Sequence, residues 1–139
     1  MAYTNLDLIN GALRELNVIA ENQDASAEQG SQCLTKLNEL MEMWQVVGID
    51  FGWYEQSSTA GDAPIPPYAR TAARTNLAVL SASQFGASVS AELATVADRT
   101  YTFLLSKFQR EQLDNVDMGH MPIGSGKYGR NRYDIMNDS

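Results

Sequence analysis

Residues 26–48, SAEQGSQCLTKLNELMEMWQVVG, are predicted to form one long helix against which the rest of the chain packs. Large apolar residues recur there at steps of three and four, so they share one helical face. They are Cys33, Leu34, Leu37, Leu40, Met41, Trp44 and Val47. Ser26 and Gln29 have the spacing of a capping box, and Gly48 tolerates a left-handed backbone where the helix ends. We expect other helices to lie along this one.

The composition is that of one globular domain. The chain has 139 residues, of which 44% are hydrophobic and 19% are charged, enough apolar mass for a core. Its formal net charge of -7 argues against binding to nucleic acid. The single cysteine, Cys33, is expected to be a small buried hydrophobe in a reducing compartment. No apolar run is long enough for a signal peptide or a membrane span, so we expect a soluble, intracellular protein.

A first helix is predicted before the long one. Thr4 can cap it, and Asp7 lies in its first turn, where a negative charge is favourable. Leu13 and Leu16 belong to its apolar stripe. Asn17 should end the helix, because asparagine is second only to glycine in adopting a left-handed conformation.

Two more helices are predicted after the long one. Prolines before Tyr68 are compatible with a helix start, and Phe85 with Gly86 is typical of its end. Ser88 or Ser90 then begins a fourth helix. Its periodic pattern fails near Gln112.

These patterns predict an all-α fold, a small bundle of four main helices in a core domain of residues 1–112. An irregular loop separates the second and third helices, and residues 113–139 form an extended C-terminal arm. The predicted core contains one set of apolar residues from all four helices. They are Leu13, Leu16, Leu34, Leu37, Met41, Trp44, Leu77, Leu80, Val96, Leu104 and Phe108.

Aromatic residues are dense just after the long helix. Residues 49–55 are compatible with a short strand or a tucked loop, and residues 56–63 have the composition of a polar surface loop. Phe51, Trp53 and Tyr54 either cover the end of the bundle or contact a partner.

The arm is rich in glycine and has no periodic apolar face, yet it carries more large apolar residues than an inert tail needs. They are Met118, Met121, Ile123, Tyr128, Tyr133, Ile135 and Met136. This composition is typical of a segment that becomes ordered on a partner. A disordered tail without function is the alternative.

No motif for catalysis, metal binding or cofactor binding stands out. Residues 124–129 match G-x-G-x-x-G, but too few residues follow for the helix and acid that a dinucleotide site needs. His120 is the only histidine, so neither a histidine-based metal cluster nor a Ser-His-Asp triad can form. Glu39 and Glu42 lie one turn apart and are either a carboxylate pair or part of a solvated face.

Three arginines lie on the predicted polar faces of the third and fourth helices. They are Arg70, Arg74 and Arg99. We expect them to pair with acids of the same or a neighbouring subunit rather than to bind phosphate.

Several segments resemble the head-to-tail adaptor, or head-completion, family of tailed phages, in particular the packaged-DNA stabilisation proteins (tail accessory factors) of short-tailed phages. The matching residues extend over most of the predicted helical core. They are Asp7-x-Ile9-x-x-Ala12-Leu13-Arg14-x-Leu16, Val18, Leu37-Asn38-x-Leu40-Met41-x-x-Trp44, Gly48-Ile49, Ile65-Pro66, Tyr68, Asn76-Leu77-Ala78, Phe85-Gly86, Val89-Ser90 and Ala97. Asn17 departs from the glycine that the family tends to have there.

The resemblance implies a virion protein at the head–tail junction, present in the host cytoplasm during assembly. Such a protein binds the portal ring after DNA packaging, in a ring of about twelve copies, one per portal subunit. It prolongs the DNA channel without sequence-specific binding to the DNA and offers a surface to the tail hub or nozzle. The resemblance also implies that the arm docks on the portal, with Arg130 and Arg132 facing acids of the portal rim.

Phe51, Trp53, Tyr54, Arg70, Arg74 and Arg99 are then candidates for contacts with neighbouring copies or the tail. A small intracellular helical adaptor that binds a host protein through its C-terminal tail is the alternative. An enzyme that uses Glu39 and Glu42 is a third reading.

Overall fold

The computed structural model describes residues 2–115, which contain four α-helices and no β-strand. Helix α1 spans Asn5–Glu15, α2 spans Ala27–Val46, α3 spans Arg70–Ser81 and α4 spans Ala91–Asn115. Short 3₁₀ turns flank α3, η1 at Pro67–Ala69 and η2 at Ala82–Phe85. The predicted all-α class is confirmed. No helix in this described part is long and apolar enough to cross a membrane.

The predicted capping box of α2 is present, and the predicted Thr4 cap of α1 is a second capping box. At α1 the Asp7 N–H donates to Thr4 Oγ1 at 3.1 Å, and the Thr4 N–H donates to the Asp7 carboxylate at 3.0 Å. At α2 the Gln29 N–H donates to Ser26 Oγ at 3.2 Å, and the Ser26 N–H donates to Gln29 Oε1 at 2.9 Å. Each box satisfies backbone groups that a bare helix end leaves unpaired.

The predicted left-handed residues lie where helices end. Asn17, Gly48 and Gly86 have φ values of 60°, 104° and 66°. For α4, Ser90 is the cap, because its hydroxyl accepts from the Leu93 N–H at 3.1 Å. The helix continues to Asn115, a little beyond the point where its apolar pattern fails.

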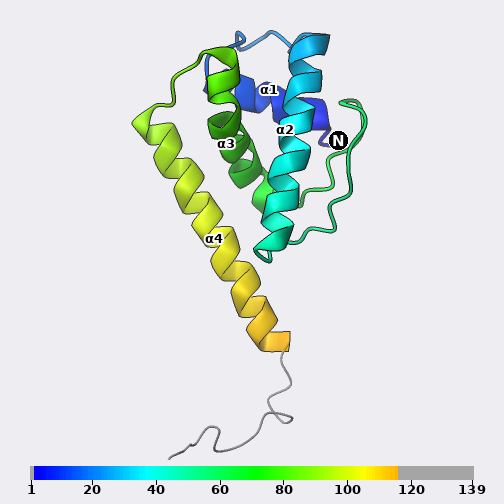
Figure 1. The fold of residues 1–139 in the computed structure, drawn as a ribbon, viewed down its shortest axis with the longest axis vertical. Coiled ribbons are helices and arrows are strands. Elements are labelled where there is room, and N and C mark those ends of the chain that lie inside the picture. Colours follow the sequence, from blue (N-terminus) through cyan, green and yellow to red (C-terminus); the bar gives the residue numbers. More distant parts are fainter. Residues whose placement is uncertain (1, 116–139) are drawn as a thin grey trace, which may run out of the picture. The chain divides into compact units, whose positions relative to one another are not determined.

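Helices α1, α2 and α3 pack together to form the core, with α1 lying across the other two (Figure 1). Small residues on α3 and its preceding turn, among them Ala69, Ala72 and Ala73, are fully buried and allow close approach. Most of the predicted core is buried, and Leu80 and Phe108 are half-buried at its edge. Val96 was predicted wrongly, since 40% of its surface is exposed.

Helix α4 packs less closely than the other three, and Asn76 Nδ2 on α3 donates to the Ala97 carbonyl of α4 at 3.0 Å. Leu93, Ala97 and Leu104 are its buried residues. The buried positions follow a stripe that Tyr101 continues, and Val96 lies at the edge of this stripe, beside Leu93. Residues up to Gln109 belong to one compact unit; residues 110–115, the end of α4, belong to a second.

Candidate interaction surfaces

The segment after α2 is a loop, which decides between the two predicted alternatives. Trp53 is only 7% exposed, so its assignment as a partner contact was wrong. Its indole N–H instead donates to Asn38 Oδ1 at 3.2 Å. Tyr54 is 65% exposed and is the one aromatic of the three that is available to a partner.

Phe51 is half-buried at the centre of an aromatic cluster. Its ring lies 6.2 Å from Trp44 and 5.6 Å from Phe108, both edge-on. It also contacts Tyr68 at 6.5 Å, and Trp44 reaches Tyr101 at 5.9 Å. Such edge-to-face pairs are favourable beyond the area that they bury. Phe51 thus joins the loop to α2 and α4. It covers the end of the bundle, which was one of the two roles predicted for it.

Asn38 holds the loop to α2, a role that the sequence analysis missed. Its Oδ1 accepts from the Gln56 N–H at 2.9 Å as well as from Trp53, and its Nδ2 donates to the Gln56 carbonyl at 2.9 Å. Gln45 adds a bond from Nε2 to the Trp53 carbonyl at 3.0 Å. An uncharged amide at the edge of an otherwise apolar helical stripe was the available signal.

The far end of the same loop pairs with the start of α1. The fully buried Asn5 side chain donates to Gln56 Oε1 and to the Ser58 carbonyl, both at 3.0 Å. Its backbone N–H donates to the Gly61 carbonyl at 2.9 Å, and the Leu6 N–H donates to the Thr59 carbonyl at 2.9 Å. Although several of its side chains are exposed, the predicted polar surface loop is therefore part of the structure that caps the first turn of α1.

Two of the three predicted arginines have partners within the chain. Arg74 Nε lies 3.5 Å from the Glu15 carboxylate, and the Arg70 guanidinium lies 4.3 Å from the centre of the Tyr3 ring. Burial raises the pKa of Tyr3 above its usual value, and the nearby charges of Arg74 and Arg70 offset this only in part. Arg99 is exposed on α4. Arg74 thus pairs with an acid of its own subunit, and Arg99 is the most accessible of the three.

Exposed apolar side chains gather in two places on the described surface. Met43, Val46 and Val47 are exposed near the end of α2. Val96 and Phe103 are exposed on α4. An open groove beside the first group is lined by Leu40, Met43, Trp44, Val47, Asn76 and Tyr101. Exposed apolar groups clustered in this way are typical of interaction surfaces.

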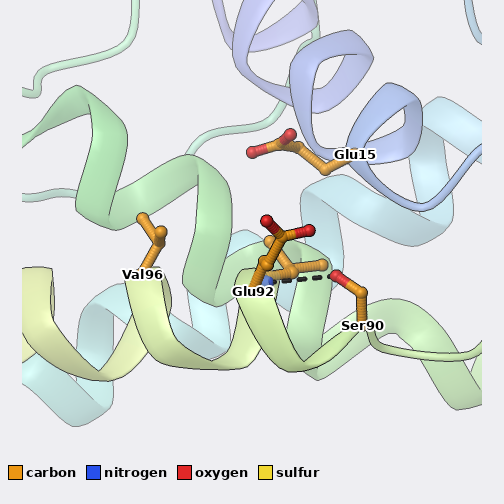
Figure 2. A pocket seen from close by; sticks show the side chains of 5 residues that line it. Glu15, Ser90, Glu92 and Val96 are labelled. Carbon is orange, nitrogen blue, oxygen red and sulfur yellow. Dashed lines mark hydrogen bonds between the residues drawn. The ribbon is translucent and has the colours of Figure 1, made fainter.

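A shallow depression lies between the end of α1 and the start of α4 (Figure 2). Glu15 approaches it from α1, and Ser90, Glu92 and Val96 line the opposite side. The Ser90 hydroxyl is occupied by the Leu93 N–H, as the dashed line shows. This arrangement provides no nucleophile paired with a base.

Glu39 and Glu42 line another shallow depression, with Thr35, Asn38 and Glu55. Both glutamates are exposed, as expected of the solvated face of α2. Across residues 2–115, no group of three or more His, Cys, Asp or Glu side chains could hold a metal ion.

Cys33 is fully buried, as predicted. Burial raises the pKa of its thiol from 9.0 to about 11, and the Ser81 hydroxyl lowers it only in part. The side chain is therefore a neutral core residue at physiological pH.

The residues predicted to dock the arm on the portal lie outside the described residues. They are Met121, Ile123, Tyr128, Arg130, Arg132, Tyr133, Ile135 and Met136. Neither the models of known protein families nor the curated proteins include a match to this chain.

Proposed function

We propose that this protein is a structural adaptor at the head–tail junction of a tailed phage. In this role it binds the portal ring after DNA packaging, prolongs the DNA channel and offers an attachment surface to the tail. Neighbouring copies form a ring, and the C-terminal arm anchors each copy to the portal. The role is structural and needs no cofactor.

The observation that carries the proposal is where the family-like residues lie in the fold. Leu13, Leu37, Met41 and Leu77 are fully or almost fully buried, and Asn38 fixes the long loop. Part of the resemblance thus falls on buried residues that determine this bundle. The exposed apolar groups on α2 and α4 further support a protein that works in contact with others.

In this proposal the C-terminal arm is the segment that binds the portal. Glycines lie among its apolar residues as far as Gly129, and the short run from Lys127 to Arg132 carries three positive charges. Docking orders this segment at a cost of roughly 2–5 kcal/mol, which burial of the apolar anchors must exceed. Repetition around a ring raises the effective concentration of each arm, so weak single contacts give a stable assembly.

Native mass spectrometry of the full chain with the portal ring of its phage tests this proposal. We expect a monomer that loads the portal to about one copy per portal subunit. A chain truncated after Asp117 should lose loading. The matched pair Tyr133→Ala/Ile135→Ala and Asn131→Ala/Asn137→Ala should separate anchors from neutral arm positions, with loss only in the first.

A full-length chain that ignores the portal would overturn the adaptor function and favour a regulator that binds a host protein. Loading that survives truncation would instead place the portal contact on the helical core, against the anchoring role of the arm.

A further inference from the structure

Helices α2 and α4 each present an exposed face with apolar side chains at its centre. On α2, Met43 is 55% exposed and Val46 is 86% exposed, with Val47 beside them. On α4, Val96 and Phe103 are seven residues apart, two helical turns, so both point from one face. Phe103 is 53% exposed, which is unusual for so large an apolar ring.

The α2 face includes a groove that suits an aromatic ring. Trp44 and Tyr101 lie at the groove between α2 and α4, and Met43 and Val47 form part of its wall. Methionine sulfur makes favourable contacts with aromatic rings, and its flexible side chain adapts to them. The groove is open to solvent.

The charges on the two faces differ in sign around their apolar centres. Glu39 lies one turn before Met43 on α2 and Glu42 lies one turn before Val46, whereas Arg99 lies between Val96 and Phe103 on α4. Lys36 on α2 and Glu92 on α4 reverse these signs at the start of each face. Two α2 faces, or two α4 faces, would therefore bring like charges together, while unlike faces offer opposite charges to each other.

We propose that the α4 face of one copy docks on the α2 face of the next copy, with Phe103 entering the groove beside Met43. Arg99 then lies near Glu39 and Glu42 of the neighbour. Because the two faces are different surfaces of the same chain, the contact is head-to-tail, and a pair of copies keeps one free face of each kind. Successive contacts produce a ring or a filament, never a closed two-fold dimer.

This contact names the neighbour interface of the proposed ring, and closure into a ring rests on the proposed function. The contact between two copies does not depend on the portal and is tested without it. Failure of portal loading and failure of the contact are therefore separate results.

Cross-linking tests the pairing with variants of the full chain that each carry one introduced cysteine besides Cys33. The native Cys33 is buried, so thiol reagents should react at an introduced surface cysteine. Val46→Cys and Phe103→Cys are mixed at high concentration with a short bis-maleimide. We expect a covalent dimer in the mixture and little in either variant alone. Equal or greater dimer in one variant alone, or none in any sample, would overturn the proposal.

A charge exchange separates the docked contact from random collision. Glu42→Arg in the Val46→Cys chain should reduce the dimer yield several-fold, because Arg99 then meets a like charge. Adding Arg99→Glu to the Phe103→Cys chain should restore the yield. Asp98→Asn, an exposed change beside Arg99, is the control and should leave the yield unchanged. If the exchange does not restore the yield, Arg99 and Glu42 do not face each other and the proposed contact is wrong.

Discussion

Single carboxamide side chains fix the irregular segments of this protein. Asn38 and Asn5 hold the two ends of the long loop. Asn10 does the same for the linker before α2, since its Oδ1 accepts from the Ala25 N–H at 2.8 Å. An amide offers a donor and an acceptor at once, so one residue can satisfy two backbone groups of a loop.

We expect Asn38→Ala to lower the free energy of unfolding by about 2–4 kcal/mol, because three loop hydrogen bonds lose their partner in a half-buried site. Urea unfolding followed by circular dichroism measures this. Ser31→Ala, an exposed change on the same helix, is the control and should stay within about 0.5 kcal/mol of the native protein. A similar small change for both variants would contradict the role given to Asn38.

Cys33 should make stability depend on alkaline pH. The fold raises the pKa of its thiol from 9.0 to about 11, so between these values the unfolded chain binds fewer protons than the folded chain. Stability therefore falls as the pH rises through this window. In Cys33→Ala the fall should be shallower, as measured by urea unfolding from pH 8 to pH 10.5. Tyr3, whose pKa is also raised, is present in both proteins and contributes equally to each. Parallel plots of unfolding free energy against pH would therefore show that the thiol contributes nothing to the pH dependence.

At the scale of elements, each helix begins and ends through local chemistry. The two capping boxes and the left-handed residues Asn17, Gly48 and Gly86 define most of the helix ends. These signals involve residues at most a few positions apart, so they act whatever the rest of the chain does.

The end of α1 offers a direct test of this local control. Asn17 has a φ of 60°, which costs an ordinary side chain about 1–2 kcal/mol. Asn17→Ala should therefore destabilise the protein by about 1 kcal/mol, while Asn17→Gly should be neutral or slightly stabilising. Thermal unfolding of both variants provides the comparison. Equal destabilisation by both would mean that the asparagine side chain, rather than the backbone, matters there.

At the scale of the whole molecule, an aromatic cluster adds to the buried residues of α4, and to a hydrogen bond from Asn76 Nδ2 to the Ala97 carbonyl at 3.0 Å, in joining α4 to the bundle. Phe51 contacts Phe108, and Trp44 contacts Tyr101. Since α4 also carries one of the two proposed docking faces, the stability of this attachment bears on assembly.

Phe51→Ala should destabilise the protein by about 3–5 kcal/mol, somewhat less if its half-buried site collapses. Hydrogen exchange should increase in α4 more than in α1, because the cluster is lost while the core of α1, α2 and α3 is kept. Phe103→Ala is a matched control on α4 and should change stability little, since its ring is exposed. Uniform exchange across all helices would contradict a separate attachment of α4.

The sequence alone determined the parts of this protein that depend on near neighbours. Periodic apolar residues and caps located all four helices and much of the core that the helices contribute, because helix formation and amphipathic faces are set within a few turns. The same reasoning considered the side chains that could take part in catalysis or metal binding and found no motif for either. It also supplied the resemblance on which the proposed function is based.

Only the tertiary structure decided what depends on distant neighbours. Asn5 and Gln56 are 51 positions apart, and no local pattern pairs them. Trp53 was a candidate for a partner contact but is buried against α2. Val96 was expected in the core but is 40% exposed, because the packing of α4 decides which residues at the edge of its stripe face inward. The charged and apolar faces of α2 and α4 likewise became visible only once the helices were placed, since exposure is a property of packing.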